Sequence, residues 1–139
     1  MSALLDSSVL VAALVQSEPH HEACHALLDR PGLVAGVHAL AETFNTLTGG
    51  RLPARLAPDL AAQAIEVTLL PSLVIIAPDG AEVMAAIRSA HRRGVRGGAI
   101  YDYLHLVTAR KADASRLYTL NTRHFLAFHR KGDPEIVHP

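Results

Sequence analysis

Short apolar runs alternate with longer segments of helical periodicity along the chain. The first run, Leu4-Leu5, ends on Asp6, and two serines and a second apolar run, Val9–Val15, follow it. Such a run is typical of a buried strand that leads into a helix. Because ligands of an open parallel sheet bind where its strands end, we expect Asp6 to lie at a binding edge.

The same pattern predicts the other elements. Further strands are expected at Leu33–Ala35, Leu73–Ile76, Leu117–Leu120 and Ile136–Val137. Helices are expected from Ser7 or Ser8, as the N-cap, to Gln16, and at His20–Asp29, His38–Thr48, Pro58–Leu69, Ala81–Arg92 and Ala99–Ala112, with a turn or short helix at Asn121–Phe125. Strands that alternate with helices imply parallel βαβ units, so we expect one α/β domain, residues 1–139, with a helix-covered parallel sheet.

Composition narrows the class of protein. Half of the 139 residues are hydrophobic and 19% are charged, which argues against disorder. No apolar run reaches the ~18 residues of a membrane span, and no basic segment precedes the first strand, so we expect a cytoplasmic protein without a signal peptide. The single Cys24 fits a reducing compartment and leaves neither an internal disulfide nor a CxxC zinc motif.

The formal net charge is zero, but its distribution is uneven. Residues 1–70 hold three Arg and Lys against seven Asp and Glu, a net charge of −4, and residues 71–139 hold ten against six, a net charge of +4. A cluster of acidic residues surrounded by basic ones could hold a metal ion at its centre and a polyanion around it. An ordinary mixed surface explains the same charges.

Four polar positions are expected to meet at one edge of the sheet. Asp6 ends the first strand, Glu42 and Asp102 lie near the starts of two helices, and Asn121 follows the strand that ends at Leu120. Carboxylates without cysteine select Mg²⁺ or Mn²⁺ over zinc, and such ions activate water for attack on a phosphodiester. The sequence therefore predicts a metal-dependent nuclease site.

Each of the three acids also has a purely structural interpretation. Asp6 would serve as an N-cap, and Glu42 would be favoured by the dipole of its helix. Asp102 lies in a largely apolar helix, where its charge needs a partner such as Arg96 or Arg123.

Four segments carry a resemblance to a known family. They are Leu4–Ala12, His38–Phe44, Gly97–His105 and Leu117–Phe125. In order and spacing they resemble the PIN-domain family and, within it, the VapC-like toxins of bacterial toxin–antitoxin pairs. The resemblance implies a three-layer α/β/α sandwich with a parallel sheet and a Mg²⁺- or Mn²⁺-dependent endoribonuclease that cleaves RNA with metal-activated water. It also implies a homodimer and a cognate antitoxin that inhibits it.

By motif position, the resemblance makes Asp6, Glu42 and Asp102 the acidic metal ligands, and Ser8 the residue that helps to order water there. Asn121 stands where many PIN domains have a fourth acid. We therefore hypothesise one firmly held ion, with any second ion dependent on substrate phosphate.

The other candidates are less specific. Arg96 and Arg123 are expected to grip RNA phosphates, with ordinary surface solvation as the alternative. His105 is expected to be a packed or solvated histidine rather than a site residue. A DNA nuclease with the same site, and a non-catalytic PIN-like module that binds RNA or protein, stay open; the neutral Asn121 favours the second.

Overall fold

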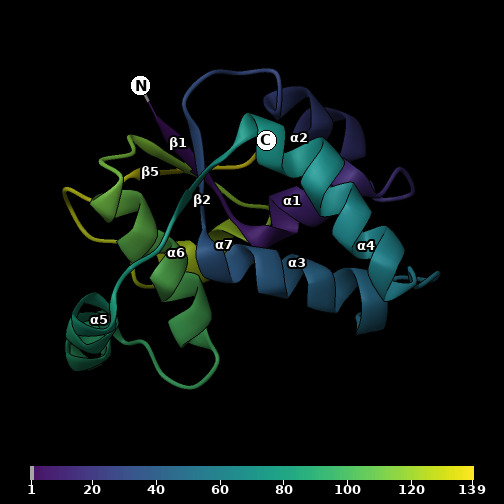
Figure 1. Cartoon of the computed structure of the whole chain (residues 1–139). Coiled ribbons are helices and arrows are strands. Elements are labelled where there is room, and N and C mark those ends of the chain that lie inside the picture. Colours follow the sequence, from purple (N-terminus) through teal and green to yellow (C-terminus); the bar gives the residue numbers. More distant parts are fainter. Residues whose placement is uncertain (1) are drawn as a thin grey trace.

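The central element is a five-stranded sheet in which every strand pair is parallel. The computed structural model describes residues 2–139. The strands are β1 (Ala3–Leu5), β2 (Leu33–Gly36), β3 (Val74–Ile76), β4 (Arg116–Tyr118) and β5 (Glu135–Val137), in the spatial order β3-β2-β1-β4-β5. β1 therefore lies at the centre, so that Asp6 follows the most enclosed strand (Figure 1).

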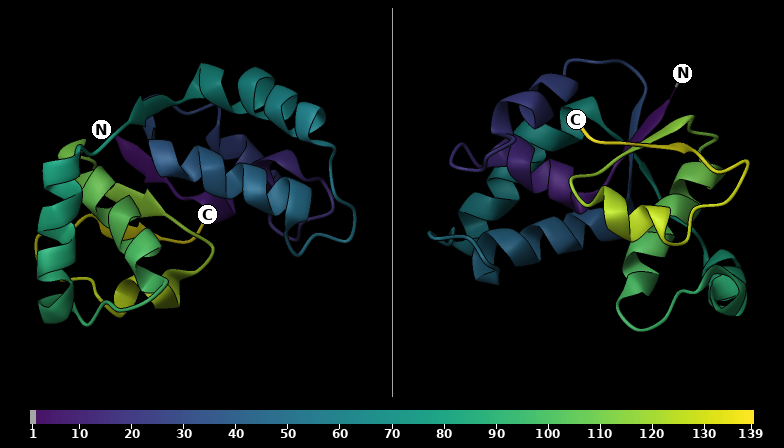
Figure 2. Two further views of the ribbon diagram at one scale, coloured as in Figure 1. Left: turned by 60° about the horizontal axis from the view of Figure 1, so that its bottom comes forward. Right: turned by 180° about the vertical axis from the view of Figure 1, so that it is seen from behind.

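Helices cover both faces of the sheet, which gives the expected α/β/α sandwich (Figures 1 and 2). They are α1 (Ser7–Leu14), α2 (His21–Leu27), α3 (Val37–Gly49), α4 (Pro58–Ala64), α5 (Gly80–Arg93), α6 (Ala99–Lys111) and α7 (Thr122–Leu126). None of the helices formed by residues 2–139 has the length and apolarity that a membrane crossing needs.

Two hydrophobic clusters form the core, one on each face. Leu5 of β1 packs with residues of α1, α2, α3 and α4, and its neighbour Leu4 packs on the opposite face with residues of α6 and α7. Successive side chains of a strand point to opposite faces, so this alternation follows from the strand itself. Leu4 and Leu5 are both 0% exposed, which fixes β1 between the two helical layers.

The predicted order of strands and helices is confirmed, with shifted ends. The expected helix Pro58–Leu69 becomes α-helical only to Ala64; Ile65–Leu69 is π-helical, and a 3₁₀ turn at Leu70–Ser72 follows. Pro71 lacks an N–H and cannot continue an α-helix, so the chain changes its winding before β3. The N-cap of α1 is Asp6, not Ser7 or Ser8.

Histidines of α2 close the other end of α1. His21 Nδ1 lies 2.7 Å from the carbonyl oxygen of Ala12, and His25 Nδ1 lies 3.2 Å from that of Ala13. A carbonyl only accepts, so each imidazole donates from Nδ1 and satisfies an orphan carbonyl at the helix C-terminus. These contacts tie α2 to α1 and account for the histidine-rich start of α2.

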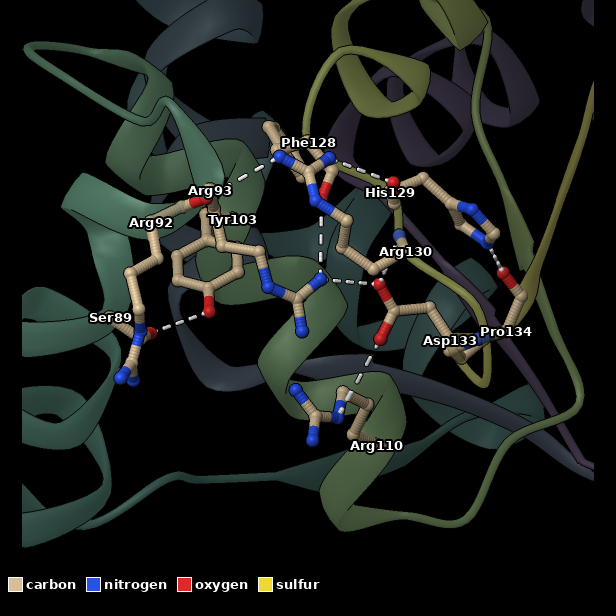
Figure 3. A network of polar contacts seen from close by, with 10 residues as sticks. All are labelled: Ser89, Arg92, Arg93, Tyr103, Arg110, Phe128, His129, Arg130, Asp133 and Pro134. Atoms are coloured by element: carbon tan, nitrogen blue, oxygen red, sulfur yellow. Dashed lines mark hydrogen bonds and ion pairs between the residues drawn. The ribbon is translucent and has the colours of Figure 1, made fainter.

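A buried ion pair fastens the C-terminal segment to α5 and α6. The Asp133 carboxylate is 3% exposed; its Oδ2 accepts from Arg93 Nη1 at 2.6 Å and from the Arg130 backbone N–H at 2.8 Å, and Arg110 Nε lies 3.8 Å from Oδ1 (Figure 3). Burial raises the pKa of Asp133, but the hydrogen bonds and the arginine charges outweigh it and hold the pKa below its usual range.

We predict that Asp133→Asn lowers the free energy of unfolding by about 2 kcal/mol at pH 7, because Arg93 loses its buried partner. A depressed pKa gives stability that is present above the unfolded pKa of about 3.9 and is lost as pH falls. The wild-type advantage should therefore shrink in acid, as measured by urea unfolding at pH 7 and pH 3. The matched control is Glu135→Gln, which removes an exposed pair with Arg116 and should cost less than about 1 kcal/mol. Equal losses in both variants would contradict the prediction.

Candidate functional site

Asp6 is held by hydrogen bonds from two sides. Its Oδ1 accepts from the Ser8 hydroxyl at 2.5 Å and from the Val9 backbone N–H at 3.2 Å, and its Oδ2 accepts from the Thr119 hydroxyl at 2.6 Å. The side chain is 2% exposed. Asp6 is thus both the N-cap of α1 and a buried carboxylate whose orientation is fixed at the carboxyl end of β1.

The residues that hold Asp6 are themselves held. Ser8 Oγ accepts from the Leu120 backbone N–H at 3.0 Å, and Thr119 Oγ1 accepts from the Asn121 backbone N–H at 2.9 Å. These contacts link the start of α1 to the segment that follows β4. Two strand ends that are distant in sequence are thereby joined at one edge of the sheet.

Glu42 lies in the second turn of α3 and pairs with α6. Its Oε1 lies 2.8 Å from His105 Nε2 and 3.8 Å from His38 Nε2. Burial raises the pKa of Glu42, but the hydrogen bond from His105 and the closeness of the two imidazoles bring it below its usual range. The dipole interpretation does not apply, because the first turn of α3 contains no acidic residue.

Asp102 lies in the first turn of α6 and is half-buried. Burial raises the pKa of its carboxyl, and the neighbouring Asp6 and Glu42 raise it further, against the opposing imidazoles of His105 and His124. The sequence suggested an arginine partner for Asp102, yet the basic side chain beside it is His124, whose Nδ1 lies 3.6 Å from Oδ2.

Two hollows open at this edge. One of about 220 Å³ is lined by Ser7, Ser8, Val11, Thr46, Arg51, Leu120 and Asn121. Another of about 470 Å³ is lined by Gly94, Gly98, Ala99, Asp102, His124, Ala127 and Phe128. Asn121 is exposed, so its amide is accessible from the first hollow as Asp102 is from the second.

The donor chemistry of the edge fits a hard divalent cation. The pKa of Asp102 is raised chiefly by burial and further by the charges of Asp6 and Glu42, and a cation bound beside this carboxylate would offset both effects. Within residues 2–139, one group of His, Cys, Asp and Glu brings three ligand atoms within 4.8 Å of one another, namely His38, Glu42 and His105. Glu42 belongs to both sets, and its contacts to the two imidazoles are made by Oε1.

The sequence missed the partners that orient the acids. Thr119, His38 and His124 contact predicted site residues and lie within the matching segments, but the resemblance gave them no role. Thr119 could have been found as the hydroxyl residue at the end of the fourth strand. The predicted Arg96 and Arg123 are exposed and lie just before α6 and in α7.

The parallel α/β/α fold with acidic residues at the carboxyl edge defines the class of protein. The chain belongs to the PIN domain family, whose model matches residues 3–131. No curated protein matches this sequence significantly.

Solved structures share the fold at low identity. VapC20 of Mycobacterium tuberculosis, described as a toxin that cleaves the sarcin-ricin loop, has a TM-score of 0.72 and 18% identity, over 96% of this chain and 100% of that chain. VapBC2 of Rickettsia felis, bound to a DNA fragment from its promoter, has a TM-score of 0.69 and 15% identity, over 100% of this chain and 99% of that chain. FitAcB of Neisseria gonorrhoeae has a TM-score of 0.66 and 20% identity, over 96% of this chain and 95% of that chain.

We predict that Asp102→Asn raises the midpoint of thermal unfolding at pH 7 in excess chelator. A raised pKa means that the folded state favours the neutral carboxyl, so ionised Asp102 costs stability once pH exceeds its folded pKa. The gain should disappear as pH falls below the unfolded pKa of about 3.9.

The matched control is Asp29→Asn, the same change at an exposed carboxylate that precedes β2, at the opposite edge of the sheet. It should leave the midpoint within about 1 °C of the wild type, as expected for a surface change. A lower midpoint for Asp102→Asn would show that the carboxylate is stabilised by its surroundings and would contradict the prediction.

Proposed function

We propose that this protein is a metal-dependent endoribonuclease and the toxin of a toxin–antitoxin pair. The observation that carries the proposal is the convergence of Asp6, Glu42 and Asp102, from three segments, at the carboxyl edge of a PIN fold. Similar solved structures include a toxin that cleaves the sarcin-ricin loop and toxin–antitoxin complexes bound to DNA. By analogy, the partners are RNA, a cognate antitoxin and a second copy of this chain, in the cytoplasm.

The three carboxylates would hold Mg²⁺ or Mn²⁺. When bound, the ion supplies Lewis-acid polarisation of the phosphodiester and lowers the pKa of a water nucleophile. Asp6 brings a fixed oxygen, because Ser8, Val9 and Thr119 donate to it. Asp102 brings the most weakly compensated charge and is the ligand that gains most from a cation.

The substrate backbone would be held by groups around the acids. Arg96 and Arg123 are exposed and supply positive charge for phosphate oxygens. Arg51, which the sequence did not suggest, lines the hollow next to Asn121 while its guanidinium donates to Glu18 at 2.6 Å. The neutral amide of Asn121 limits the edge to three acidic charges, which favours one firmly held ion.

We predict that Asp102→Asn reduces Mn²⁺-dependent cleavage of single-stranded RNA by about 1,000-fold or more, because a lost ligand removes several kcal/mol of transition-state stabilisation. Asp29→Asn should cleave like the wild type. The measurement is gel analysis of labelled RNA with Mn²⁺ or with excess chelator, beside flap DNA as a second substrate.

Growth arrest on induced expression in a bacterial host tests the toxin assignment. The wild type and Asp29→Asn should arrest growth, and Asp102→Asn should not. Cleavage of flap DNA alone would reassign the substrate. RNA binding without cleavage at saturating Mn²⁺ would support the non-catalytic module instead. Full cleavage by a folded Asp102→Asn protein would refute the site.

A further inference from the structure

A histidine inside α6 contacts one of the proposed ligands. His105 is 1% exposed, and its Nε2 lies 2.8 Å from Glu42 Oε1. Its ring packs against the His38 ring, with centroids 4.2 Å apart, and lies near the Phe125 ring at 6.4 Å. The imidazole is therefore almost fully buried, with the Glu42 carboxylate as its hydrogen-bond partner.

The surroundings determine which nitrogen of His105 carries the proton. Nδ1 is buried and has no hydrogen-bond partner among residues 2–139. A proton there would leave an unsatisfied buried N–H, at a cost of about 1–3 kcal/mol. A carboxylate only accepts, so the proton belongs on Nε2, from which His105 donates to Glu42.

The same reasoning separates this cluster from a histidine metal site. A metal needs the Nε2 lone pair, which would move the His105 proton to the unpartnered Nδ1. His38 Nε2 lies 3.3 Å from the Tyr101 carbonyl oxygen, which also only accepts, so this nitrogen is a donor as well. Both imidazoles thus act as hydrogen-bond donors at the junction of α3 and α6.

This junction sets the spacing of two proposed ligands. His105 lies one turn after Asp102 on α6, so the two side chains share a face of the helix. The partner of His105 is Glu42, on α3. The packing is tight, because a Cβ on Gly36, the residue that precedes α3, would lie 3.0 Å from the His38 ring. A movement of α3 away from α6 would therefore lengthen the contact between Glu42 and His105.

We infer that His105 is a positioning residue, which holds Glu42 through an Nε2–H hydrogen bond at Oε1 and leaves Oε2 to ligate the cation. The inference rests on the proposed function, because it assumes that Glu42 is a ligand. Hydrogen bonds that orient metal ligands are worth roughly 10- to 100-fold in metal affinity or activity.

The test compares variants that differ in where they place a donor. His105→Gln carries an amide that reaches the position of Nε2, and His105→Asn is one methylene shorter and falls short of Glu42. His105→Leu fills the volume without a donor and is the second variant if the Asn protein does not fold. Thr108→Val is the matched control, since Thr108 is buried on the same helix and its hydroxyl donates only to the Leu104 carbonyl.

Mn²⁺ affinity is measured by titration calorimetry and RNA cleavage by gel, with thermal melts as the folding check. We expect His105→Asn and His105→Leu to weaken Mn²⁺ binding and cleavage by 10-fold or more. His105→Gln should stay within about 3-fold of the wild type, and Thr108→Val should bind Mn²⁺ as the wild type does.

The two proposals fail differently. Wild-type binding and cleavage that persist unchanged in folded His105→Asn and His105→Leu would overturn the positioning role alone. Equal weakening by Gln and Asn would overturn it too, because donation at the Nε2 position would not matter. A wild type that binds Mn²⁺ but cleaves no RNA would overturn the nuclease, while the affinities still decide the role of His105. A wild type that binds no Mn²⁺ would overturn the assignment of Glu42 as a ligand and the inference with it.

Discussion

The hydrogen bonds at the Asp6 carboxylate join the elements on which the rest of the site depends. A carboxylate that is 2% exposed has lost most of its hydration, which costs several kcal/mol. Charge-assisted hydrogen bonds from Ser8, Val9 and Thr119 and the N-terminus of α1 offset that cost. Because these donors come from α1 and from the end of β4, the charge can stay buried only if the two segments meet.

The three acids of the edge are compensated to different degrees. Asp6 is satisfied by donors, and Glu42 is satisfied at one oxygen by His105. Asp102 has two acidic neighbours, and the His124 nitrogen at 3.6 Å is beyond hydrogen-bond distance, so its burial is the least compensated. A cation at this edge would not need to reorient Asp6 or Glu42, since both side chains are already fixed. Its most favourable interaction would be with the charge of Asp102. Two of the three carboxylates are thus preorganised, and the charge of the third is the one that a cation would compensate.

Residues that typically start or end helices and strands made most of the fold predictable. Asp6 after Leu4-Leu5, Gly49-Gly50 at the end of α3 and Pro78-Asp79 before α5 mark boundaries that the structure reproduces to within a few residues. The end of the fourth helix was wrong, because helical periodicity does not distinguish α from π winding. Side-chain partners were harder to predict, since Glu42 and His105 are 63 residues apart and Asp6 and Thr119 are 113 apart. Such pairs depend on how helices pack on the sheet.

The position of Asp6 follows directly from the junction of β1 and α1. A helix that starts directly after a strand is capped by the residue at the end of that strand, so the predicted place of Asp6 at the sheet edge and its N-cap role go together. At Asn121 the backbone, not the side chain, makes the structural contact. Its backbone N–H supports Thr119, and through it Asp6, whatever its side chain is. The backbone of Asn121 therefore supports Asp6, and its side chain can be an amide without weakening the hydrogen bonds that hold Asp6.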